Sequence, residues 1–187
     1  MPANRPDPLQ HKLHDHWRMF LIEGIVLLVL GAAAVILPPI AGVAVTIILG
    51  WLFLIGGFVG LVATFGARQA PGFFWSLLSA ALAILVGGVL LWNPLAGLVT
   101  LTYVLIVYFV AEGVFAIAFA IAHRRELMGR WEWMAFNGII DIVLAAIIIA
   151  GLPGAFAWAL GLLVGIDLLF GGGALIAMAL AARKAGE

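Results

Sequence analysis

Residues 18–65 read RMFLIEGIVLLVLGAAAVILPPIAGVAVTIILGWLFLIGGFVGLVATF. Two apolar runs flank the dipeptide Pro38-Pro39, and each run is long enough to cross about 30 Å of hydrocarbon. The charged residues of the stretch are Arg18 at its start and Glu23. A helix satisfies its own backbone hydrogen bonds within such a run, so the stretch predicts two transmembrane helices joined by a turn.

The rest of the chain has the same character. Hydrophobic residues make up 66% of the 187 residues and charged residues 10%, and the mean hydropathy is +1.25. Soluble domains are about 45–50% apolar and about 25% charged. The formal net charge is zero, which favours no nucleic-acid partner, and the lack of cysteine excludes disulfides and thiolate metal sites. We therefore expect the lipid bilayer as the main partner of an all-α membrane protein.

Six apolar segments are long enough to span a membrane, and their predicted bounds are about 18–37, 41–65, 73–92, 95–122, 133–151 and 155–180. They belong to a predicted transmembrane domain over residues 17–182. Residues 1–16 are polar and contain three prolines, without the features of a cleaved signal, and predict a cytoplasmic tail. Residues 183–187 predict a second cytoplasmic tail.

Proline marks one kind of separator between these segments. Pro39, Pro94 and Pro153 lie in short uncharged connections, and proline disfavours helix in the residue before it. We expect a hairpin turn at each of the three.

The other separators carry every basic residue of the chain. The nine are Arg5, Lys12, Arg18, Arg68, Arg124, Arg125, Arg130, Arg183 and Lys184. Six spans place all of them on one side of the membrane, and the positive-inside rule makes that side cytoplasmic. The sequence thus predicts a bacterial inner-membrane protein with both termini in the cytoplasm.

The chain also repeats itself. A shift of 55 residues places Pro39 on Pro94, and a shift of 114 places Gly24 on Gly138 and Pro39 on Pro153. The predicted repeat units are helical hairpins over about 18–65, 73–122 and 133–180. Because each unit has two spans, all three have the same orientation, which predicts parallel repeats.

Small residues predict where helices pack. In lipid, close backbone approach at glycine supplies much of the attraction between helices. The candidate packing positions are Gly56, Gly57, Gly60, Gly113 and Gly172. They fit packing within the chain, and a homo-oligomer or another membrane-protein partner is the alternative.

Four acids lie within the predicted spans: Glu23, Glu112, Asp141 and Asp167. An ionised side chain at the bilayer centre costs about 2.5–3.5 kcal/mol on insertion scales, so these acids should avoid lipid. Hydrogen bonding that fixes helix register, proton sensing or conduction, and cation binding all remain open for them. In the N-terminal tail, His11, His14 and His16 fit a solvated segment, a metal clip or a pH switch.

Three segments are similar to sequences of the HdeD family of bacterial inner-membrane proteins: WRMFLIEG at 17–24, PLAG at 94–97 and RELMGRW at 125–131. The resemblance extends over about residues 15–182. It implies a multi-pass inner-membrane protein linked to acid resistance, and it supplies no catalytic or binding residues.

No Walker loop, nucleophile elbow or zinc-protease motif occurs in the sequence. We expect neither an enzyme nor a cofactor. The leading hypothesis is a non-enzymatic membrane protein of the acid or general stress response. The alternative is a small proton-coupled transporter or channel that uses the buried carboxylates.

Overall fold

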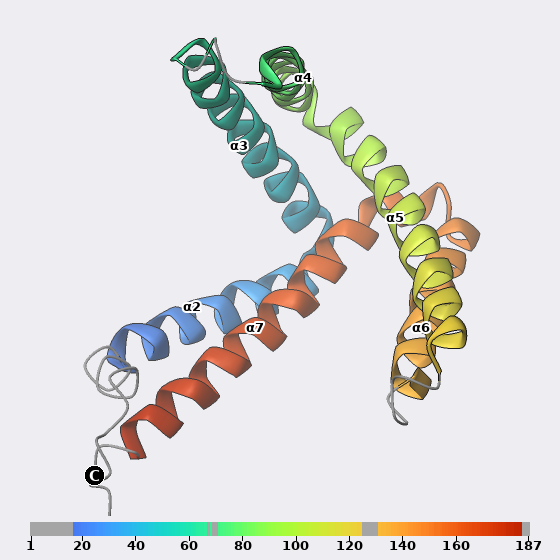
Figure 1. The fold of residues 1–187 in the computed structure, drawn as a ribbon. Coiled ribbons are helices and arrows are strands. Elements are labelled where there is room, and N and C mark those ends of the chain that lie inside the picture. The colour runs from blue at the N-terminus through green and yellow to red at the C-terminus, as the bar shows by residue number, and fades with distance from the viewer. Residues whose placement is uncertain (1–16, 67, 69–70, 125–130, 185–187) are drawn as a thin grey trace, which may run out of the picture. The chain divides into compact units, whose positions relative to one another are not determined.

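The computed structural model describes residues 17–66, 68, 71–124 and 131–184. Its elements, labelled in Figure 1 where there is room, are α2 (Trp17–Ile36), α3 (Pro38–Gly66), α4 (Phe73–Trp92), α5 (Pro94–Ala122), α6 (Trp131–Ala150), η1 (Gly154–Ala157) and α7 (Ala159–Lys184). The six α-helices are each long and apolar enough to cross a membrane. The predicted all-α fold with six spans is therefore confirmed. The predicted tail 1–16 lies outside the described residues.

The helices begin and end where proline and asparagine favour it. Pro38 and Pro39 occupy the first turn of α3, and Pro94 is the first residue of α5. In the first turn of a helix the missing N–H of proline costs nothing, because that group has no partner within the helix. The side chain of Asn93 accepts a hydrogen bond of 3.1 Å from the backbone N–H of Ala96 and so caps α5.

The third proline connection differs from the first two. Pro153 follows a cis peptide bond and precedes the 3₁₀ turn η1, so α7 begins at Ala159 and not at the predicted residue 155. Backbone N–H groups in this turn reach back three residues, from Phe156 to Pro153 and from Trp158 to Ala155. Ala155 is fully buried, which explains why this short connection is ordered.

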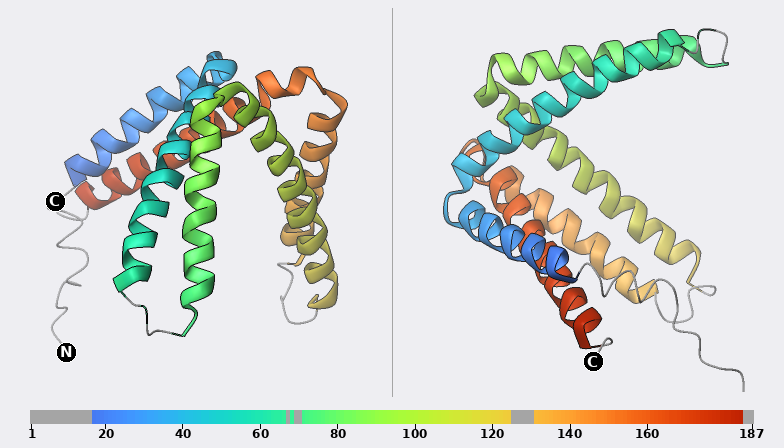
Figure 2. Two further views of the ribbon diagram at one scale, coloured as in Figure 1. Left: turned by 90° about the horizontal axis from the view of Figure 1, so that it is seen from above. Right: turned by 90° about the vertical axis from the view of Figure 1, so that its left-hand side faces the viewer.

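The described chain forms two compact units, one of residues up to Ala41 together with those from Gly161, and the other of Gly42–Leu160. In the first unit α2 and α7 lie side by side, which Figures 1 and 2 both show. A Cβ placed on Gly24 would lie 2.9 Å from the carbonyl oxygen of Gly172. The two backbones therefore touch, as glycine allows between helices in lipid.

The contact between α2 and α7 continues along both helices. A Cβ on Gly31 would lie 2.9 Å from the carbonyl oxygen of Gly165. At the Trp17 end of α2, the guanidinium of Arg183 lies 5.6 Å from the ring centre of Trp17, a cation–π distance. Trp17 is also 5.4 Å from the guanidinium of Arg18. The first and last helices thus form one packed pair.

The second unit contains two more pairs, α3·α4 and α5·α6. Figure 2 shows α3 beside α4, and Figures 1 and 2 show α5 beside α6. In α3·α4 a Cβ on Gly57 would lie 2.6 Å from Cγ1 of Ile84 and 3.0 Å from the carbonyl oxygen of Ala80. A Cβ on Gly87 would lie 2.7 Å from the carbonyl oxygen of Gly50. This pair is built as α2·α7 is, with small residues where the backbones cross.

The glycine contacts within each unit join helices that belong to different hairpins of the sequence repeat. The repeat joins α2 to α3, α4 to α5 and α6 to α7 through proline connections. The close contacts join α3 to α4 and α5 to α6 across the connections that contain Arg68 and Arg124, and α2 to α7. The crossing glycines Gly57, Gly113 and Gly172 hold the same place in each pair. The sequence repeat and the packing unit are thus offset by one helix.

Candidate functional site

The α5·α6 crossing brings two backbones into contact and sets the spacing of the side chains around it. A Cβ on Gly113 would lie 2.6 Å from the carbonyl oxygen of Gly138, and a Cβ on Gly138 would lie 2.7 Å from the carbonyl oxygen of Gly113. Side chains that adjoin this crossing therefore come together from two helices.

Two of the four acids adjoin the crossing. Glu112 directly precedes Gly113, and Asp141 is three residues beyond Gly138. The Cβ of Asp141 would lie 3.2 Å from a Cβ on Gly113, the residue that follows Glu112. Asp141 is half-buried and Glu112 is exposed. The structure thus places two acidic residues of separate helices beside one crossing, and we call these two residues the carboxyl pair.

Tyr108 extends this carboxyl pair along α5. It precedes Glu112 by one helical turn, and the two side chains therefore lie on the same face of α5. Asn137 precedes Asp141 by one turn on α6. No lysine, arginine or histidine occurs in α5 or α6. The site is therefore acidic and hydrogen-bonding, without a basic counter-charge on its own helices.

The other two acids belong to α2·α7. Glu23 precedes the crossing residue Gly24, Asp167 follows Gly165 by two residues, and both side chains are exposed. In the part of the chain that the structure describes, neither forms a hydrogen bond or an ion pair. Glu23 holds the place in α2 that Asn137 holds in α6, one residue before the crossing glycine.

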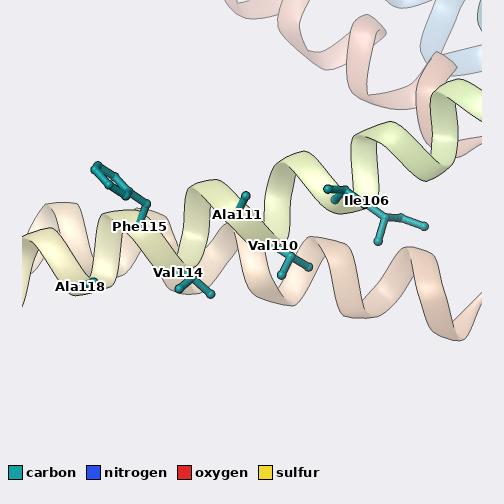
Figure 3. A pocket seen from close by; sticks show the side chains of 7 residues that line it. Ile106, Val110, Ala111, Val114, Phe115 and Ala118 are labelled. Carbon is teal, nitrogen blue, oxygen red and sulfur yellow. The ribbon is translucent and has the colours of Figure 1, made fainter.

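A hollow of about 530 Å³ runs along α5 beside this site. Its lining side chains all come from α5 and are entirely apolar, as the sticks in Figure 3 show: Ile106, Val107, Val110, Ala111, Val114, Phe115 and Ala118. Such a surface suits lipid and carries no reactive group. Among the described residues, no three His, Cys, Asp or Glu side chains gather as a metal site requires.

The chain matches a family described as a short repeat of unknown function (DUF308), once over residues 22–92 and again over 78–150. The chain belongs to this family. The two DUF308 matches overlap and are offset by about one two-helix unit, which confirms the internal repeat. Each match covers three helices, so it includes both a proline connection and a packed pair.

Curated relatives of this DUF308 chain are named Protein HdeD, from Escherichia coli (strain K12), Escherichia coli O157:H7 and Shigella flexneri. Each is 25% identical over 171 residues, which cover 89% of this chain and 88% of the relative. Together with the family match they confirm the HdeD resemblance. No solved structure matches the chain.

Proposed function

We propose that this chain is a non-enzymatic inner-membrane protein of the acid or general stress response, and that Glu112 and Asp141 form its proton-responsive element. The observation that carries the proposal is the placement of two acidic residues, one from α5 and one from α6, beside the Gly113·Gly138 crossing. Proton uptake there replaces repulsion between α5 and α6 by neutrality. Similarity to Protein HdeD supports the proposed role in the inner membrane under acid stress.

The contacts favour a responsive role over a register-fixing role. The three helix pairs are held at glycine crossings, where the backbones touch. The hydroxyls of Thr46 and Thr102 donate to backbone carbonyls of their own helices. The carboxyls are not required as bridges between helices, so their titration remains available for function.

Acid survival of cells that carry Glu112→Gln or Asp141→Asn tests the proposal. Both substitutions keep the size and polarity of the side chain and remove the titrating group. We expect folded, membrane-inserted protein and loss of protection during acid challenge. Asp167→Asn, which removes an acid from α7, is the matched control and should protect as the wild type does. Full protection by both site variants would refute the proposal.

Proton flux separates this role from that of a proton-coupled transporter. Purified protein in liposomes with an imposed pH gradient should leave the gradient intact if the carboxyl pair only responds to protons. A flux that Asp141→Asn abolishes would instead establish the transporter. α3 and α5 run for 29 residues each without a break, whereas transporters commonly bind substrate at interrupted helices.

We also propose that both termini lie in the cytoplasm, on the side of all nine basic residues. Reporter fusions after Arg68 and Arg124 should report cytoplasm, and fusions at Asn93 and Gly154 should report the opposite side. A non-cytoplasmic signal at Arg124 would contradict the topology.

A further inference from the structure

A groove of about 550 Å³ lies on one flank of the α3·α4 pair. Its lining is mostly small residues: Gly56, Gly57, Gly60, Ala63, Thr64, Trp75, Ser76, Ser79, Ala80 and Ala83. The Thr64 hydroxyl donates 2.7 Å to the carbonyl oxygen of Gly60 and is satisfied within α3. The floor of the groove is therefore two helix backbones with little side chain upon them.

The described protein does not fill this groove. A Cβ on Gly56 would meet no atom within 4 Å, and one on Gly60 would meet only the Cβ of Ala80, at 3.5 Å. The space beside the neighbouring Gly57 is filled by the side chain of Ile84. A gap of this kind forfeits dispersion contacts unless another molecule enters it.

The length of the groove along the two helices favours a lipid acyl chain over a transmembrane helix as its occupant. It extends from Gly56 to Thr64 on α3 and from Ala83 back to Trp75 on α4. At 1.5 Å per residue that is about 12 Å, less than half of the roughly 30 Å hydrocarbon layer. A transmembrane helix crosses the whole layer, whereas an acyl chain from one leaflet ends near its middle.

The mouth of the groove carries groups that suit a phospholipid headgroup. Trp75 is 71% exposed there, and tryptophan favours the membrane interface. Phe65 follows the lining residue Thr64, and the guanidinium of Arg68 lies 5.1 Å from the centre of its ring. Guanidinium is suited to phosphate, and Arg68 is the basic residue of the α3–α4 connection.

We infer that the α3·α4 groove binds an anionic phospholipid from the leaflet on the side of the α3–α4 connection. One acyl chain lies in the groove, and the headgroup phosphate pairs with Arg68. The corresponding flank of α5·α6 lacks this shape, because Glu112 and Asp141 stand where α3·α4 has Gly56 and Ala83. The lipid site is thus particular to α3·α4 and independent of the acidic site.

Native mass spectrometry of the purified full chain, with added phosphatidylglycerol or phosphatidylethanolamine, tests the inference. The wild type should retain phosphatidylglycerol in preference to phosphatidylethanolamine. Gly56→Leu places a side chain in the open groove and should lower bound phosphatidylglycerol about tenfold, which equals about 1.4 kcal/mol. Arg68→Gln should remove the preference for the anionic lipid.

Gly88→Leu is the matched control. Gly88 is on α4, a Cβ there also meets no atom within 4 Å, and it does not line the groove. This variant should bind phosphatidylglycerol as the wild type does, which shows that the effect of Gly56→Leu is local. Equal binding by wild type and Gly56→Leu would overturn the inference. A change from dimer to monomer in Gly56→Leu would also overturn it, in favour of a second copy in the groove.

Discussion

The α3·α4 and α5·α6 pairs share one construction and differ in what they present beside it. Each crosses at a glycine of the earlier helix, Gly57 or Gly113, with an isoleucine of the later helix against it. One residue before the crossing glycine, α3 has Gly56 and α5 has Glu112. The flank is an open groove lined by small residues in the first pair and an acidic site in the second.

This difference shows that the helix crossing can stay the same within the repeat while the side chains beside it change. The crossing needs a small residue at one position of each helix, and this requirement recurs. The neighbouring position lies outside the closest contact, so the two backbones can touch whether it is glycine or glutamate. A repeat family can in this way keep its architecture and vary its sites.

Filling the crossings should have the largest effect on stability. Gly57→Leu and Gly113→Leu each place a Cβ within 2.6 Å of another atom, so the two helices must separate. We expect a loss of about 3 kcal/mol or more in each, at the upper end of overpacking costs. Thermal melting in detergent measures it, and Gly171→Leu, where a Cβ meets nothing within 4 Å, should melt as the wild type does. A mild effect in only one pair would show that the two crossings are not equivalent.

Truncating the isoleucines should have an intermediate effect. Cγ1 of Ile84 would lie 2.6 Å from a Cβ on Gly57, and Cγ1 of Ile142 would lie 2.7 Å from one on Gly113. Ile84→Ala and Ile142→Ala should each cost about 1–2 kcal/mol, below the range for fully buried sites because lipid refills part of the space. Unfolding with denaturant in mixed micelles gives both values. Costs that differ by more than a factor of two would weaken the comparison.

Two threonines should give the smallest effect. Thr46 and Thr102 are fully buried, and each hydroxyl donates 2.9 Å to the carbonyl oxygen four residues earlier. Thr46→Val and Thr102→Val keep the shape and remove one hydrogen bond within a helix, which we expect to cost less than the average of about 0.6 kcal/mol for a hydrogen bond between membrane helices. Melting temperatures should fall slightly and equally. A fall in Thr46→Val as large as that of Gly57→Leu would mean that the hydroxyl has another role.

The sequence predicts the spans and the positions of their connections well, because length, apolar composition, proline and arginine act locally. It does not predict which helices pack together. The six helices are apolar all round, so no polar face excludes a neighbour, and proline connections such as that at Pro39 make adjacent helices seem the natural pairs. The glycines at the crossings are the one sequence feature that relates to the pairing. Gly113 and Gly138 identify the α5·α6 pair only when it is known that each contacts the backbone of the other helix.

The acidic site is unpredictable for the same reason. Glu112 and Asp141 lie on different helices, and only the α5·α6 contact brings them together. The sequence also does not predict the start of α7 correctly, and the reason lies in the residues just before it. Residues 154–157 are as apolar as the helix that follows, so no change in polarity marks the turn η1.

The pairing of α2 with α7 has a consequence for biosynthesis. α2 leaves the ribosome well before its partner α7, because the two helices are far apart along the chain. At about 5–20 residues per second, the roughly 150 residues from the end of α2 to the end of α7 take about 7–30 s to make. During that interval the surface around Gly24 and Gly31 lacks its α7 partner. A chaperone or insertase that shields small-residue helices would act on this nascent chain, and any chain interrupted before Gly165 would present an unpaired first helix to membrane proteases.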